Sequence, residues 1–234
     1  ESRNRRSRGW AIRLQGENHA GPMLGLSSTN SVFDMSGGTL NFTSNGGGTN
    51  FQLMNIAAQT GNYKVTGGTV NLNLPSSGTV YTAISSVPFY DMNLTNQSGS
   101  GTVTVQWSAP SPLTILNNLT IGSNSVLDLS TNTIDLNVGH NFNLNGTYTA
   151  GNNTTTFNGN VGQVFSNAGT ITTSLNNFVL ENASNTNITN NLTIRGALTI
   201  NSSCFLNDQG NTISVAATLQ IREYTQARRT VVLL

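Results

Sequence analysis

The chain has 234 residues and a formal net charge of +1, and only 8% of its residues are charged, against about 25% in ordinary soluble domains. Asparagine and threonine are abundant in their place. From Leu14 to Ile221, two bases stand against seven acids, a formal charge of −5. This excludes a nucleic-acid surface, because phosphate binding needs clustered lysine and arginine. The single cysteine excludes an intramolecular disulfide and a cysteine zinc site. The sequence contains no run of about 18 apolar residues, so we expect no transmembrane helix.

Residues 1–31 form a basic segment that differs from the rest of the chain. Its arginines Arg3, Arg5, Arg6 and Arg8 are candidates for contact with an anionic partner. Trp10 to Leu14 reads as a first strand or cap, with Trp10 and Ile12 inward, and residues 21–30 read as a loop. The segment lacks the apolar core of a signal peptide.

Repetition begins near Val32. The sequence Met-Ser-Gly-Gly-Thr-Leu-Asn-Phe at 35–42 is echoed by Val-Thr-Gly-Gly-Thr-Val-Asn-Leu at 65–72. Each copy predicts a Gly-Gly turn that leads into an alternating strand. Further on, residues 103–112 are an insertion relative to a later, shorter connection, and we expect a loop that leaves one face of the repeat.

The segment from Leu113 to Leu144 carries the clearest pattern. Apolar residues alternate with Thr, Asn, Asp and Ser in short runs, which is typical of strands with one buried face. The pentapeptide Asn-Asn-Leu-Thr-Ile begins at Asn117 and again at Asn190. Such internal similarity favours a repeat architecture.

We therefore predict an all-β fold: one right-handed parallel β-helix, or β-solenoid, over residues 32–221, with about seven to nine coils. The alternative is an antiparallel β-sandwich, in which adjacent strands would pair as hairpins. Stacked asparagine and threonine side chains should line the outside. The side chains predicted to point inward are Leu113, Ile115, Leu119, Ile121, Leu129, Ile134, Leu136, Leu192, Ile194, Leu198 and Ile200.

The Asn-Asn-Leu-Thr-Ile repeats, the Gly-Gly-Thr turns and the Asn/Gly/Thr-rich strands resemble the repeat regions of secreted or surface-anchored proteins of Bacteroidetes-type bacteria. They also resemble the β-helical passenger regions of adhesins and autotransporters. The resemblance covers about residues 32–221. It implies an extracellular or cell-surface location and a structural or adhesive role, with glycans or surface proteins of host or neighbouring cells as partners.

Four residues in the body are candidates for surface binding. Asp128 and Asp135 occupy outward positions, where paired carboxylates could act on a glycan, while Trp107 and Tyr90 could stack on sugar rings. The pattern favours solvated aspartates and core aromatics, so we predict no enzyme. His140 lies in a turn. The sequence contains no cluster of metal-ligating or cofactor-binding residues, so we predict no cofactor. Adventitious calcium is the metal that the surface could bind.

Residues 222–234 break the repeat, and they end in the apolar run Thr-Val-Val-Leu-Leu. We expect this segment to pair as a last strand, to cap the coil, or to seek a neighbouring molecule. In the last case the protein should associate end to end. Basic termini meeting acidic bodies would make that association weaker in salt.

Overall fold

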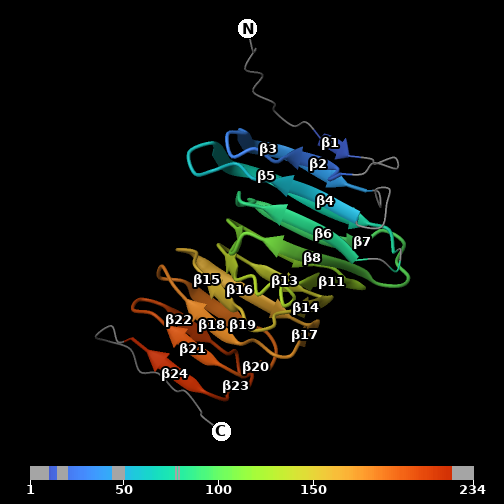
Figure 1. Cartoon of the computed structure of the whole chain (residues 1–234). Helices are drawn as coiled ribbons and strands as arrows, with labels where there is room; N and C mark the ends of the chain where they lie inside the picture. The colour runs from blue at the N-terminus through green and yellow to red at the C-terminus, as the bar shows by residue number, and fades with distance from the viewer. Residues whose placement is uncertain (1–10, 15–20, 44–50, 77, 79, 223–234) are drawn as a thin grey trace.

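The computed structural model describes residues 11–14, 21–43, 51–76, 78 and 80–222. Within these ranges all regular secondary structure is β, in 24 short strands. Figure 1 shows them stacked in layers from the N-terminal to the C-terminal end of the chain. The strands pair in parallel throughout the described part of the chain.

Four sheets run along the stack. The nine-stranded sheet has, in spatial order, β1 (Ala11–Leu14), β3 (Phe33–Phe42), β5 (Tyr63–Leu74), β7 (Asp91–Asn96), β10 (Leu119–Ile121), β13 (Phe142–Leu144), β16 (Gly162–Asn167), β19 (Asn185–Ile188) and β22 (Phe205–Asn207). The seven-stranded sheet has β17 (Thr170–Thr172), β14 (Thr147–Thr149), β11 (Ser125–Asp128), β8 (Val103–Ala109), β6 (Val80–Ser85), β4 (Phe51–Ile56) and β2 (Leu24–Leu26).

The six-stranded sheet has β24 (Thr218–Ile221), β21 (Ala197–Ile200), β18 (Asn177–Leu180), β15 (Thr154–Phe157), β12 (Leu136–Val138) and β9 (Leu113–Ile115), and a two-stranded sheet pairs β20 (Leu192–Ile194) with β23 (Ile213–Val215). Consecutive strands therefore lie in different sheets, and each strand pairs with one that is a full coil away. The chain is a parallel β-solenoid of about seven turns, as predicted, and the antiparallel sandwich is wrong.

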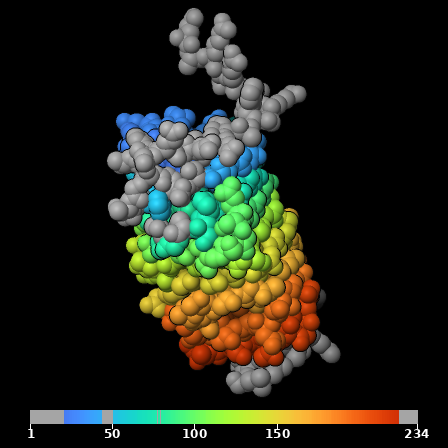
Figure 2. Space-filling view, turned by 90° about the vertical axis from the view of Figure 1, so that its right-hand side faces the viewer, coloured from blue at the N-terminus to red at the C-terminus, as the bar shows by residue number. Residues whose placement is uncertain are grey.

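The coils differ along the stack. From β1 to β7 the chain alternates between the nine-stranded and seven-stranded sheets, and from β8 onward it passes through three strands in each coil. The separation along the sequence between residues that stack in neighbouring coils changes accordingly. It is 30 residues between Asn41 and Asn71 and 22 between Asn71 and Asn93, and then 23 between Asn118 and Asn141. Figure 2 shows the coils as successive bands of colour from one end to the other.

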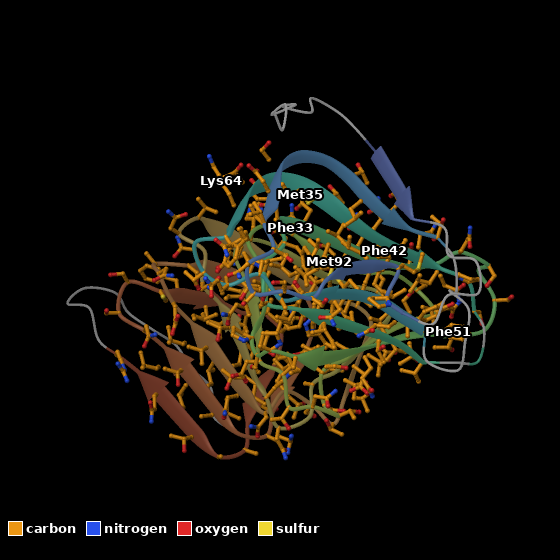
Figure 3. All side chains as sticks on the ribbon, turned by 45° about the horizontal axis from the view of Figure 1, so that its top comes forward. Phe33, Met35, Phe42, Phe51, Lys64 and Met92 are labelled. Carbon is orange, nitrogen blue, oxygen red and sulfur yellow. The ribbon has the colours of Figure 1, made fainter. Side chains whose placement is uncertain are left out.

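The interior is a continuous apolar core. All eleven side chains predicted to point inward are buried, because strand alternation sends every second residue to the same face. Figure 3 shows Phe33, Met35, Phe42 and Met92 inside the N-terminal coils, with Lys64 outside. Further along, the rings of Phe142 and Phe165 stack with their centroids 4.9 Å apart.

Glycines allow the corners of neighbouring coils to approach closely. At the corner that follows the nine-stranded sheet, Gly122, Gly146 and Gly169 lie one above the other. A Cβ on Gly146 would overlap the carbonyl oxygen of Gly122, and a Cβ on Gly169 would overlap that of Gly146. A side chain at these positions would push the coils apart.

Three sequence interpretations need correction. Part of the predicted loop at 21–30 is the strand β2, which pairs with β4, while β1, in the segment predicted as a first strand or cap, pairs with β3. The supposed insertion at 103–112 contains β8, an integral strand between β6 and β11. The two Asn-Asn-Leu-Thr-Ile copies are not equivalent: the first gives β10 in the nine-stranded sheet and the second gives β20.

Candidate functional site

Trp107 is not available to a ligand. Strand β8 turns Val103, Val105 and Trp107 inward, and the indole is fully buried, with its ring edge-on to Phe89 at 6.1 Å. Its N–H finds no hydrogen-bond partner among the described residues. The prediction of Trp107 as a sugar-stacking surface residue is therefore wrong, because the strand parity that makes β8 part of the solenoid places this ring in the core.

Asp128 lies on the outer face of β11, as predicted, but its carboxylate is engaged locally. Oδ1 accepts from the N–H and hydroxyl of Ser130 at 2.8 and 2.7 Å, and Oδ2 accepts from the hydroxyl of Thr131 at 2.8 Å and the amide of Gln106 at 3.3 Å. Burial raises the pKa of Asp128, but these hydrogen bonds together outweigh it and hold the pKa below its ordinary value of 3.8. A carboxylate stabilised in its charged form is a poor general acid.

Asp135 is separated from Asp128 by the turn that leads from β11 to β12. Its Oδ1 accepts the N–H of Thr154 in the next coil at 2.7 Å, and its own N–H donates to the hydroxyl of Ser111 in the preceding coil at 3.0 Å. Asp135 therefore joins three successive coils at this corner. Each aspartate has a separate structural task, and no interaction between them is present.

Arg195 reaches across the same side of the solenoid. Its guanidinium donates to the backbone carbonyl of Gly151 and, at 2.7 Å, to Oδ1 of Asn152. These partners lie 44 and 43 residues earlier in the chain, nearly two coils away. The long side chain thus spans the intervening coil and links two coils that are not neighbours.

Tyr90 and His140 come together at another corner, where the chain enters the nine-stranded sheet. The carbonyl of Tyr90 accepts the N–H of Asn117 at 2.8 Å, and the carbonyl of Asn117 accepts the N–H of His140 at 3.0 Å. The three residues thus stack in consecutive coils, each about 4.8 Å from the next. All three are half-buried, and Leu116 beside them is 39% exposed.

This corner is rigid. Asp91 accepts at Oδ1 from the side-chain amide of Asn117 at 2.8 Å and from the N–H of Asn118 at 3.0 Å. The carbonyl of His140 accepts from the fully buried amide of Gln163 at 2.7 Å. The imidazole Nδ1 lies 3.4 Å from Nδ2 of Asn141. The polar groups are therefore held in place without a ligand.

Asparagines form ladders on the outer face of the nine-stranded sheet, as predicted. Nδ2 of Asn71 donates to Oδ1 of Asn41 at 2.8 Å, and Nδ2 of Asn93 donates to Oδ1 of Asn71 at 2.9 Å. A second ladder pairs Asn207 with Asn187 at 3.0 Å. The face is polar, uncharged along these columns, and regular.

Sequence reasoning missed a second use of asparagine, in which the side chain bonds to the backbone of the next coil. Oδ1 of Asn118 accepts the N–H of Asn141 at 3.3 Å. Asn167 accepts the N–H of Asn190 at 3.1 Å and donates to the carbonyl of Asn191 at 3.0 Å. The recurrence of asparagine one coil later, as in 118 and 141 or 167 and 190, is the signal that could have found these clamps.

Polar side chains also occur inside the core. The hydroxyl of Tyr148 lies 3.0 Å from that of Thr155, and Asn153 donates to both the hydroxyl of Tyr148 at 3.1 Å and the carbonyl of Ile134 at 2.6 Å. Burial raises the pKa of Tyr148 to about 12. A neutral, buried phenol of this kind stabilises the turn before β15 and does not supply a base.

The remaining predictions concern metals and the termini. Among the described residues, no three His, Cys, Asp or Glu side chains gather closely enough to hold a metal ion. The described ranges contain no helix long and apolar enough to cross a membrane. Arg3, Arg5, Arg6 and Arg8, the side chains of Trp10 and Ile12, and the apolar run at 230–234 lie outside the described residues.

Comparison with known proteins does not assign the chain to a family. No family model, no curated protein and no solved structure matches the chain. What the fold defines is a class: a β-solenoid whose coils are joined by asparagine side chains.

Proposed function

We propose that this chain is a non-enzymatic structural and adhesive module of a bacterial cell-surface or secreted protein. It is a rigid repeat scaffold for display or attachment. The observation that carries the proposal is the use of polar side chains to join coils along the solenoid, as in the Asn41–Asn71–Asn93 ladder and the Asn167 clamp. The bacterial surface location rests on the sequence resemblance alone.

Rigidity follows from the way these bonds are arranged. A solenoid is stabilised by contacts between neighbouring coils, and side-chain ladders add hydrogen bonds to each of those contacts. Asp128 and Asp135, the residues that would serve a carbohydrate-cleaving site, instead hold turns and neighbouring coils. A scaffold that presents weak sites in a fixed geometry gains strength from multivalency.

The competing function is a carbohydrate-active β-helix, and an activity assay separates the two. We expect the full chain, incubated with a panel of neutral and acidic polysaccharides, to release no new reducing ends and no unsaturated products. Turnover that is abolished in Asp128→Asn or Asp135→Asn would overturn the proposal in favour of an enzyme.

A self-assembling fibre subunit is a second candidate, favoured by the C-terminal end of the described solenoid. The inward-facing residues Ile213, Val215, Leu219 and Ile221 are only partly buried, whereas their pairing partners Leu192, Ile194, Leu198 and Ile200 are buried. Within residues 80–222 no strand pairs with the outer edges of β22, β23 and β24, and an incompletely covered core beside such edges favours the addition of another strand. Light scattering of the full chain across a salt series should show association, and the basic termini meeting acidic bodies should make it weaken with added salt. A monomer at high concentration and low salt would exclude the fibre.

A further inference from the structure

We infer that the corner formed by Tyr90, Asp91, Leu116, Asn117, His140 and Asn141 is a binding site for a neutral saccharide. The inference rests on the proposed adhesive function and names the ligand class and its location. We call this set of six residues the Tyr90–His140 corner.

The first argument is that the fold gathers chemically useful side chains here from three coils. Tyr90 and His140 are distant in the chain, yet only the stacked residue Asn117 separates them, through two backbone hydrogen bonds. The fold thus places a tyrosine, an asparagine and a histidine, each half-buried, in three consecutive coils at one corner. Aromatic side chains with polar neighbours supply both apolar contact area and hydrogen-bonding direction.

The second argument is exposure. Leu116 is 39% exposed, and Val161, in the equivalent turn of a following coil between β15 and β16, is 53% exposed. Few large apolar side chains of the described chain are this open to solvent. Apolar surface beside fixed polar groups suits the C–H face of a sugar ring, whose hydroxyl groups then meet the amides.

The third argument is charge. No lysine or arginine occurs in the turns that build the corner, at 88–91, 116–118 and 139–141. The charged side chain present is Asp91, which Asn117 and Asn118 hold by hydrogen bonds. An anionic saccharide, a phosphate or a nucleic acid would meet the Asp91 carboxylate here, and these three turns offer it no lysine or arginine, so the corner favours a neutral ligand.

The fourth argument is preorganisation. The backbone of His140 is fixed on one side by the carbonyl of Asn117 and on the other by the buried amide of Gln163. Asn141 is fixed by Oδ1 of Asn118 through its N–H, and its own Oδ1 accepts the N–H of Val164 at 2.9 Å. A site that is already ordered loses little conformational entropy when a ligand binds.

The test is an NMR titration of the isotope-labelled full chain with maltohexaose, cellohexaose and mannohexaose, with an oligogalacturonate of the same length as the acidic control. We expect at least one neutral hexasaccharide to shift the amide signals of Asn117 and His140, with the oligogalacturonate weaker. Tyr90→Ala should weaken binding roughly tenfold, as expected for loss of one aromatic contact. Leu116→Ser, which changes an exposed side chain and leaves the core intact, should weaken it severalfold.

Phe205→Ala is the matched control, because Phe205 is an aromatic residue that is 46% exposed on β22, far along the stack from the corner. It should leave binding unchanged. Failure of all three neutral probes at millimolar concentration, preference for the acidic probe, or shifts centred elsewhere would overturn the inference. Any of these results would leave the scaffold proposal standing, since that proposal depends on the absence of turnover and not on this corner.

Discussion

The two-stranded coils of the N-terminal part and the three-stranded coils that follow differ in coil length, in strand length and in the contacts between neighbouring coils. From β3 to β7 the coil length changes from 30 to 22 residues, and long strands such as β5, with 12 residues, carry Gly-Gly irregularities in their pairing. From β10 to β19 the strands have three to six residues, and in the nine-stranded sheet paired residues of successive coils are 23 residues apart.

The difference shows what a constant spacing along the nine-stranded sheet makes possible. Where this spacing is constant, glycines stack at the corner of Gly122, Gly146 and Gly169, and the paired residues Phe142 and Phe165 stack their rings in the core. Asparagines also recur where they can clamp the next coil. When the period varies, coupling between coils depends on the ladders along the long strands. We therefore expect the three-stranded region to be the more stable part.

The largest effect should come from the aromatic stack of the three-stranded region. Phe165 contacts the rings of Phe142, Phe157 and Phe178, so Phe165→Ala should lower the free energy of unfolding by about 3–5 kcal/mol. Chemical denaturation measures this loss. Phe89→Ala in the earlier region, where the ring meets Phe33 and Trp107, should have an equal or smaller effect. A much larger loss at Phe89 would reverse the comparison.

A smaller but sharper effect should come from the glycine corner. A Cβ at position 146 overlaps the carbonyl oxygens of Gly122 and Ser125, so Gly146→Ala should destabilise the chain by about 1–3 kcal/mol. Gly162→Ala is the matched control in the same region, because a Cβ there meets no atom within 4 Å. Equal thermal midpoints for the two variants would contradict the close approach of the coils.

The two uses of asparagine should be separable by their energies. Asn167 is 7% exposed and bonds to the backbone of Asn190 and Asn191; its loss leaves backbone groups unpaired, so Asn167→Ala should cost about 1–3 kcal/mol. Asn71→Ala breaks a ladder that water can reach, and should cost about 0.5–1 kcal/mol. Denaturation of both variants under one condition gives the ratio, and a larger loss at Asn71 would show that ladders dominate.

The smallest effect should be a pH dependence at Asp128. Its pKa is lower in the folded chain than in the unfolded chain, so its carboxylate stabilises the fold above about pH 4, and this contribution is lost as the pH falls through the folded pKa. The difference in thermal midpoint between wild type and Asp128→Asn should therefore shrink between pH 6 and pH 3. Asp34→Asn, at an exposed position of β3, is the control, and a constant difference for Asp128→Asn would contradict the lowered pKa.

The sequence predicted the strands well because alternation is a local property. Each inward residue between Leu113 and Leu144 that was predicted from the pattern is buried. The same alternation could not say to which sheet a strand belongs. Leu-Thr-Ile occurs in β9, β10, β20 and β21, which lie in three different sheets. The sheet that a strand joins depends on the length of the turns between strands, and the local alternation of residues does not predict that sheet.

The candidate site was harder to predict than the fold. Its aromatic ring makes Tyr90 a candidate from the sequence, but the stacking of Tyr90, Asn117 and His140 depends on the register between coils. Trp107 is a candidate for the same reason, yet it is buried, because residues 103–109 form the strand β8 and not an inserted loop. Asp128 was placed correctly on the outer face, whereas its hydrogen bonds to Ser130 and Thr131 arise from a turn geometry that composition does not specify.

We expect the three-stranded coils to be the most stable part of this continuous parallel solenoid. Native-state hydrogen exchange of the full chain, resolved by residue, tests it most directly. We expect the slowest exchange for amides in β10, β13, β15, β16 and β18, and faster exchange in β2, β4 and β6. Slowest exchange in β2 to β6, or equal protection along the whole chain, would contradict it.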